Sequence, residues 1–206
     1  MKGLKYIEVN PFIFGLGNPL KKWLGEIKIV HIVRHPLTYI PSVLNYIPSV
    51  LYRFPSKYRS HLRERFLWNL NVSRALKDKN IEWESLSKIE QKAWYWVYVN
   101  HRIQSYEETS ERYLVIKFEN LFSPEKAIQE KAIKSLINFL GLELPKNIYS
   151  NEFANKVNES LKDPTPPWNQ WDKRTLESVL RICGKGMEKY DYRALPVETS
   201  PLELIP

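Results

Sequence analysis

The sequence feature that most constrains the fold is an apolar run that ends in a turn and leads into a helix. Residues 26–33 (EIKIVHIV) are rich in β-branched side chains and nearly continuous in apolar character. This pattern predicts a buried strand of a parallel sheet. The tripeptide Arg34-His35-Pro36 interrupts the run, and Thr38 is a candidate N-cap for the helix that follows. A strand that passes into a helix in this way is typical of an α/β protein.

The rest of the chain alternates between strand and helix patterns. We expect strands at 5–9 and 112–118, irregular segments at 11–18 and 142–171, and helices from Thr38 to about Pro48 and over 56–78, 83–105, 123–141 and 172–189. Ser123 is the expected cap of the helix over 123–141, and Gly141 is its expected end. These elements predict a helix-rich α/β fold, a parallel sheet flanked by helices. One domain over 1–195 and a loose, proline-rich tail at 196–206 are expected.

Composition limits the compartment and the class of protein. The chain has 206 residues and a single cysteine, Cys183, so it has no disulfide within itself and fits a reducing compartment. No signal peptide is evident, and no stretch reaches the ~18 apolar residues that a membrane-spanning helix needs. We therefore expect a cytoplasmic protein without a membrane span. No group of Cys, His and Asp residues has the spacing of metal ligands, so no metal site is expected.

Positive charge is concentrated in the first part of the chain. Residues 1–80 hold 14 Lys/Arg and 4 Asp/Glu, a net charge of +10, whereas residues 81–206 hold 17 and 19, a net charge of −2. This asymmetry indicates either an anionic partner or a solvated basic face. A basic nucleic-acid-binding protein is an alternative, but no nucleic-acid-binding motif is present and we do not expect a nucleic-acid partner. The basic run 53–65 could receive an anionic acceptor or form a solvated helix face.

The junction between the first long strand and its helix is the expected functional site. Ligands of α/β proteins bind beyond the carboxyl ends of parallel strands, and a helix that starts there offers free N–H groups to an anion. Arg34 at the strand end can bind a phosphate bidentately, and Ser42, eight residues on, can add a hydroxyl. His35 could hydrogen-bond phosphate or only shape the turn.

Three segments resemble sulfotransferases. Residues 29–42 (IVHIVRHPLTYIPS) resemble the 3′-phosphate-binding segment of that family, residues 113–141 its strand, Tyr-Glu-Asp-Leu and helix, and residues 168–192 its C-terminal region. The resemblance implies a P-loop-NTPase-like sulfotransferase fold in which Arg34 and Ser42 bind the 3′-phosphate of 3′-phosphoadenylyl sulfate. Phe118 replaces the tyrosine that lies against the adenine. His35 and Asn120 replace family aspartates, and Tyr190 lies near the family's usual aromatic.

The resemblance also implies an activity and an omission. It implies transfer of a sulfuryl group from 3′-phosphoadenylyl sulfate to a hydroxyl or amine of a small-molecule or carbohydrate acceptor, with adenosine 3′,5′-bisphosphate as product. The family's Gly-rich loop for the 5′-phosphosulfate has no match in residues 1–28, so we expect an N-terminally truncated version of the fold. A catalytically inactive or fragmentary nucleotide-binding remnant is the alternative. Glu8 is the candidate catalytic base, since Glu8-Val9-Asn10-Pro11 partly matches the family's Glu-Lys-x-Pro.

Other chemically active residues have ordinary packing roles as the main interpretation. His31 alternates with apolar residues in the predicted strand, which is typical of a core histidine with satisfied hydrogen bonds. His61 and His101 lie on predicted helices without an evident partner. The aromatic residues between 94 and 98 are expected to pack a helix against the sheet, and an acceptor-binding platform is the alternative interpretation.

Overall fold

The computed structural model describes residues 6–9, 22–23, 25, 27–46, 70–77, 81–107, 112–143 and 165–192. In these residues the protein is a helix-rich α/β structure with a small parallel sheet flanked by helices, as the sequence predicted. Its elements are β1 (Ile29–Val33), α2 (Pro36–Asn45), α4 (Leu70–Lys77), the 3₁₀ helix η3 (Trp83–Ser85), α5 (Lys88–Gln104), β2 (Tyr113–Lys117), α6 (Phe118–Leu121), α7 (Lys126–Leu140), the 3₁₀ helix η5 (Trp168–Gln170) and α8 (Lys173–Lys189).

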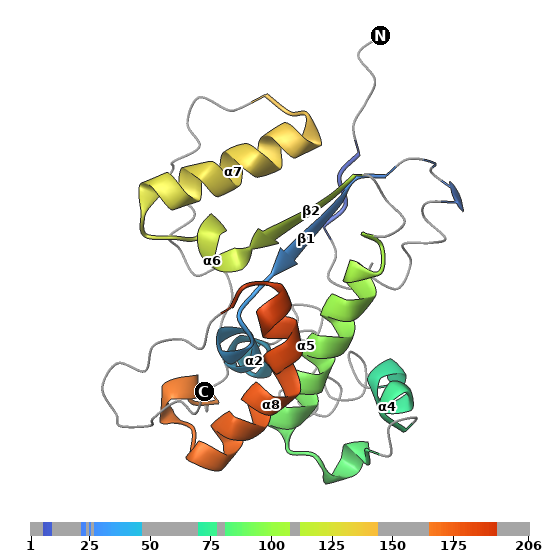
Figure 1. Cartoon of the computed structure of the whole chain (residues 1–206), viewed down its shortest axis with the longest axis vertical. Coiled ribbons are helices and arrows are strands. Elements are labelled where there is room, and N and C mark those ends of the chain that lie inside the picture. The colour runs from blue at the N-terminus through green and yellow to red at the C-terminus, as the bar shows by residue number, and fades with distance from the viewer. Residues whose placement is uncertain are drawn as a thin grey trace, which may run out of the picture.

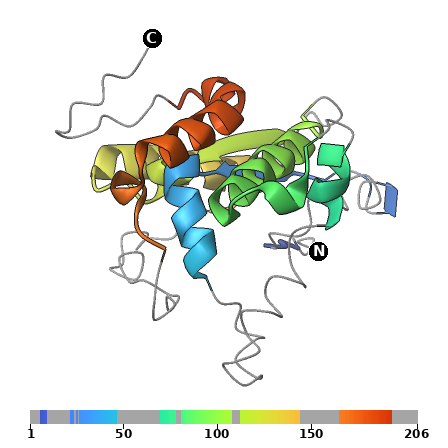
Figure 2. The same cartoon turned by 90° about the horizontal axis from the view of Figure 1, so that it is seen from below.

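The sheet forms the middle layer of the described structure. Strands β1 and β2 pair in parallel, and the register places Ile29 beside Tyr113 and Val33 beside Lys117. Helix α7 lies on one side of the two strands and α2, α5 and α8 lie on the other (Figure 1). The view from below shows α2 and α5 in front of the strands (Figure 2). Both strands end at the same edge, which is therefore where their next residues meet.

Alternation along the strands divides the core in two. The strand residues Val30, Leu114 and Ile116 pack against α7, in a cluster with Leu121 and Ala132. On the opposite face Val33 joins the main cluster, which includes Ile40 of α2, Trp96 of α5 and the α8 residues Val179, Cys183 and Met187. Fully burying an aliphatic side chain of this kind contributes about 1.5–3 kcal/mol.

Strand β1 is less enclosed than its sequence suggests. The prediction of a buried strand holds for Val33, whose side chain is 1% exposed, but Ile32 is 48% exposed. The described sheet has only two strands, so each strand has a neighbouring strand on one side only. Fewer side chains therefore pack around a residue such as Ile32.

Several helix ends follow from local sequence. Asp172 caps α8, because its carboxylate accepts the Thr175 N–H at 2.9 Å. Gly141 ends α7 in the left-handed conformation with φ of 68°, which glycine adopts without a side-chain clash. The predicted helix over 83–105 divides into η3 and α5, since Ser87 and Glu90 form a capping box that starts α5 at Lys88.

Other predicted boundaries were wrong. Thr38 does not cap α2: the helix begins at Pro36, because His35 Nδ1 accepts the Leu37 N–H at 3.2 Å and so caps it three residues earlier. Pro41 therefore lies inside the helix rather than in its first turn. Ser123 accepts the Glu125 N–H at 3.1 Å, yet α7 starts only at Lys126.

Two further differences concern short segments. Residues 6–9 form no strand. The short helix α6, which follows β2 directly, was not predicted.

Several predictions cannot be compared, because their residues lie outside the described part of the chain: the loop 11–18, Pro48, His61, the basic run 53–65 and the tail 196–206. None of the described helices is both long and apolar enough to span a membrane.

Candidate anion-binding site

Arg34 is the centre of the candidate site, at the carboxyl end of β1. Its Nη1 donates a hydrogen bond to Ser42 Oγ at 3.1 Å, and its Nε donates to Thr38 Oγ1 at 3.2 Å. Thr38 and Ser42 are one helical turn apart on α2, so both hydroxyls lie on the same face of the helix. The structure thus brings together the arginine and the serine that the sequence placed in one site, and adds Thr38.

Phe118 supports the guanidinium of Arg34. The guanidinium carbon lies 4.5 Å from the centre of the Phe118 ring, a cation–π distance. The register explains this contact: Val33 pairs with Lys117, so the residues that follow them are neighbours. The Phe122 ring lies 4.5 Å from that of Phe118, tilted by 34°. An adenine that contacts Phe118 therefore has to share the ring with these two side chains.

Arg34 keeps its positive charge although it is partly buried. Partial burial lowers the pKa of the guanidinium from its ordinary value, and the negative charge of Glu119 and the Tyr192 hydroxyl oppose that effect. Arginine nevertheless remains a cation at neutral pH, because its pKa starts so high. The backbone carbonyl of Arg34 accepts a hydrogen bond from Trp96 Nε1 at 2.8 Å, which fixes the junction against α5.

His35 shapes the turn that follows Arg34. Its side chain is 2% exposed, and its Nδ1 caps α2 through the Leu37 N–H. Its own backbone N–H donates to Glu119 Oε1 at 2.8 Å. Of the two roles considered for His35 from the sequence, the observed contacts fit the structural one.

The first N–H groups of α2 are occupied, which corrects the expectation that they are free to bind an anion. Pro36 has no N–H, Leu37 donates to His35 Nδ1, and Thr38 and Tyr39 both donate to the His35 carbonyl. Side chains are therefore the donors that remain for an anion at this junction, and the helix N-terminus would add only its partial positive charge.

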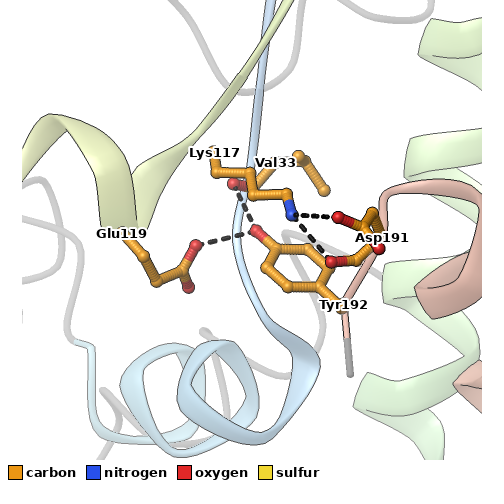
Figure 3. A network of polar contacts seen from close by, with 5 residues as sticks. All are labelled: Val33, Lys117, Glu119, Asp191 and Tyr192. Carbon is orange, nitrogen blue, oxygen red and sulfur yellow. Dashed lines mark hydrogen bonds and ion pairs between the residues drawn. The ribbon is translucent and has the colours of Figure 1, made fainter. Parts of the chain in front are cut away.

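Three residues at this edge were not identified from the sequence: Lys117, Glu119 and Tyr192. The Tyr192 hydroxyl lies 3.0 Å from the Val33 carbonyl oxygen and 2.7 Å from Glu119 Oε2 (Figure 3). Burial is the main reason that the pKa of Tyr192 is raised, with Glu119 adding to it, so the hydroxyl stays protonated. The register places Lys117 and Glu119 at the strand ends, but no local pattern points from Glu119 to Tyr192, 73 residues later.

Glu8 is not brought to the site. Glu8 is exposed, and its carboxylate accepts a hydrogen bond from the Tyr6 hydroxyl at 2.5 Å. That contact is the main reason that the pKa of Tyr6 is raised. Figures 1 and 2 both place segment 6–9 toward the amino ends of the strands, whereas Arg34 follows a carboxyl end. Within the described residues no contact joins Glu8 to Arg34 or Ser42, so the catalytic role of Glu8 stays a prediction.

His31 is a core residue, as its position in the strand indicated. It is 1% exposed, and Asn100 Oδ1 lies 2.8 Å from its Nε2. The amide nitrogen of Asn100 donates to the Trp96 carbonyl, so its oxygen faces the imidazole and Nε2 carries the proton. His31 Nδ1 then accepts from the Tyr113 hydroxyl at 2.6 Å. Both nitrogens of the neutral ring are satisfied.

The aromatic residues of α5 contribute to packing. Trp96 is 2% exposed in the main cluster, and Tyr95 is 4% exposed in a second cluster with Val72 and Leu76 of α4. Trp94 and Tyr98 are partly buried beside that second cluster. Within the residues that the structure describes, no group of three or more His, Cys, Asp or Glu side chains could hold a metal ion.

Comparison with known proteins leaves the site to be interpreted from its own geometry. No family model, no curated protein and no solved structure matches the chain.

Proposed function

We propose that this protein binds the 3′-phosphate of an adenosine nucleotide at Arg34 and Ser42, as a sulfotransferase-like protein would. The observation that carries this proposal is the 3.1 Å hydrogen bond between Arg34 Nη1 and Ser42 Oγ at the carboxyl end of a parallel strand. Ligands of parallel α/β proteins bind beyond that end of the strands. The same two residues carry the resemblance to sulfotransferases in the sequence.

The donor set fits a phosphate. A guanidinium has five N–H donors, and the contacts to Thr38 and Ser42 use two of them. The remaining donors suit the paired oxygens of a phosphate. The Thr38 hydroxyl donates to the His35 carbonyl at 3.1 Å, whereas the Ser42 hydroxyl accepts from Arg34 and has its own proton to offer to a phosphate oxygen.

The activity that this binding would serve is sulfuryl transfer from 3′-phosphoadenylyl sulfate to a hydroxyl or amine acceptor. In that reaction the bond between sulfur and the 5′-phosphate oxygen breaks, a bond from sulfur to the acceptor forms, and the acceptor loses a proton. Arg34 and Ser42 would hold the distal phosphate of the donor and so orient it. Phe118 would contact the adenine beside Arg34.

A binding protein without catalysis is the second candidate. Two observations favour it: residues 1–28 contain no match to the loop that binds the 5′-phosphosulfate, and segment 6–9 with Glu8 lies toward the other end of the strands. Glu8 therefore lies away from the edge at which it would take the acceptor's proton.

Calorimetric titration with adenosine 3′,5′-bisphosphate tests the proposal. Adenosine 5′-monophosphate, which lacks only the 3′-phosphate, is the control ligand. We expect the bisphosphate to bind more tightly, and Arg34→Ala to weaken it by about 10- to 100-fold, the usual value of hydrogen bonds to a charged group. Arg34→Lys keeps the charge but loses the planar fork, so its affinity should be intermediate.

Arg102→Ala is the matched control, because Arg102 is an exposed arginine on α5. Equal binding of the two nucleotides, or equal losses in Arg34→Ala and Arg102→Ala, would contradict the 3′-phosphate site. If the site is confirmed, incubation with 3′-phosphoadenylyl sulfate and a set of phenol, alcohol and amine acceptors separates transfer from binding alone.

A further inference from the structure

We propose that residues 190–192, called the strap below, compete with an anionic ligand for the carboxyl edge of the sheet, so that binding at Arg34 requires the strap to lift. The inference rests on the proposed anion site and goes beyond it, because it assigns that site an internal competitor. Tyr192 is the residue that holds the strap in place.

The first observation is where Tyr192 lies. Its hydroxyl contacts the Val33 carbonyl at 3.0 Å and Glu119 Oε2 at 2.7 Å, so it touches the ends of both β1 and α6 (Figure 3). Its ring packs edge-on against His35, with 5.0 Å between ring centres. The residues on either side of Arg34 are thus both contacted by Tyr192. Arg34 and Tyr192 also interact electrostatically, so the guanidinium and the phenol belong to one neighbourhood of the sheet edge.

The second observation is that the strap engages another cation of the same edge. Lys117 Nζ donates to the Asp191 carbonyl at 2.7 Å, lies 3.8 Å from Asp191 Oδ2 and stands 4.9 Å from the centre of the Tyr192 ring (Figure 3). Lifting the strap would release this ammonium for a second anionic group. An anion therefore gains a partner when the strap leaves.

The third observation is the charge that the strap holds near Arg34. Glu119 accepts from the His35 N–H and contacts the Tyr192 hydroxyl, so both oxygens of its carboxylate are positioned. Its negative charge acts on Arg34 and would repel an incoming phosphate in the same place. Without the Tyr192 contact this carboxylate keeps only the hydrogen bond from the His35 N–H among these two contacts, so it is held less firmly beside Arg34.

The strap contains a left-handed residue. Asp191 has a φ of 50°, a conformation that aspartate adopts more readily than most residues other than glycine. A single phenol proton cannot serve both the Val33 carbonyl and the Glu119 carboxylate fully. Tyr190 belongs to the main core cluster, so the movement that we propose concerns Asp191 and Tyr192, which are held at the sheet edge by Lys117, Val33 and Glu119.

Tyr192→Phe is the decisive variant, because it keeps the ring and removes the hydroxyl that reaches Val33 and Glu119. We expect it to bind adenosine 3′,5′-bisphosphate about five-fold more tightly than the wild type by calorimetry, a change typical of one modest hydrogen bond. Tyr190→Phe is the matched control. The Tyr190 hydroxyl is buried in the same strap and has no hydrogen-bond partner among the described residues, so its removal should leave the affinity unchanged.

Hydrogen exchange supplies the reciprocal test. Coupling between the ligand and the strap acts in both directions, so saturating bisphosphate should speed exchange in the wild-type peptide over 188–192. The amide N–H groups of Asp191 and Tyr192, which donate to Glu188 and Met187, report the change. Circular dichroism checks that each variant is folded.

The outcomes separate the two proposals. Tighter binding by Tyr192→Phe alone, with faster exchange on ligand addition, supports competition. Weaker or equal binding, or slower exchange on ligand addition, overturns it while the anion site stands. If neither the wild type nor Tyr192→Phe binds the bisphosphate, the proposed site and the competition for it are both rejected.

Discussion

At the scale of single residues, the two buried histidines, His31 and His35, have structural rather than chemical roles. His31 is neutral because both ring nitrogens are hydrogen-bonded, and His35 caps a helix through Nδ1. Neither imidazole is placed as a base for an acceptor at Arg34. The charged residues of the site are instead Arg34, Lys117 and Glu119, which come from the ends of both strands and the first turn of α6.

The stability of the protein should depend on pH through His31. Burial lowers the pKa of His31 below its ordinary value of 6.5, partly opposed by the hydrogen bond to Asn100. In the unfolded chain His31 binds a proton near pH 6.5, whereas in the folded chain it stays neutral to a lower pH. The free energy of unfolding therefore falls as the pH drops from about 7 to about 5.5. One group can contribute a slope of up to about 1.4 kcal/mol per pH unit.

Urea unfolding at several pH values measures this slope. His31→Gln removes the titrating group and should flatten the dependence, whereas His101→Gln, at an exposed histidine on α5, should not. Acidic groups with a lowered pKa, such as Asp172, titrate below this window. Equal slopes for His31→Gln and the wild type would show that His31 is protonated without loss of structure.

The crossing of α5 and α8 is the main packing contact at the scale of elements. Val179, Cys183 and Met187 recur along one face of α8 and meet Ala93 and Trp96 of α5. Gly186 permits the close approach, because a Cβ built there would lie 2.7 Å from Trp96 Cζ3. The same indole donates to the Arg34 carbonyl, so this crossing also positions the candidate site.

Two glycines of α8 should respond to alanine with opposite signs. Gly186→Ala gains helix propensity but inserts a methyl group against the Trp96 ring, and we expect a net loss of about 1–2 kcal/mol in the free energy of unfolding. Gly184→Ala meets no atom within 4 Å and should gain up to about 1 kcal/mol. Chemical denaturation compares the two variants. A stabilised Gly186→Ala would mean that α8 packs less closely on α5 than described.

At the scale of the whole molecule, the opening of the core can be measured by the reactivity of the single cysteine, Cys183. Cys183 is fully buried, and burial raises the pKa of its thiol to about 12. The thiolate is the reactive form, so labelling in the native state requires opening of the helices around it. We expect the rate of labelling by a disulfide reagent to rise with urea in step with global unfolding followed by circular dichroism.

A variant with Cys183→Ala and Lys185→Cys provides the comparison, because position 185 is exposed on the same helix. Its thiol should react at the rate of a free cysteine without denaturant. Fast labelling of wild-type Cys183, independent of urea, would instead show that α8 separates from the core by a local opening.

The sequence by itself determined the element types and much of their order. The β-branched runs predicted both strands, and Ser87, Asp172 and Gly141 end or start helices through bonds to residues a few positions away. Such signals are local, so they can be identified without the fold. The predicted cap of α2 was wrong. His35 Nδ1 and the Thr38 hydroxyl are both close enough to the first turn to accept its N–H groups, and sequence spacing does not decide between them.

The tertiary structure alone decided what surrounds Arg34. Arg34 and Ser42 are only eight residues apart, so their pairing could be predicted, as could the neighbourhood of Phe118 once the strand register is known. The contacts of Tyr192 with Val33 and Glu119 join residues 159 and 73 positions apart. They exist because α8 crosses α5 and returns the chain to the strand ends, a path that depends on packing and has no counterpart in any local pattern.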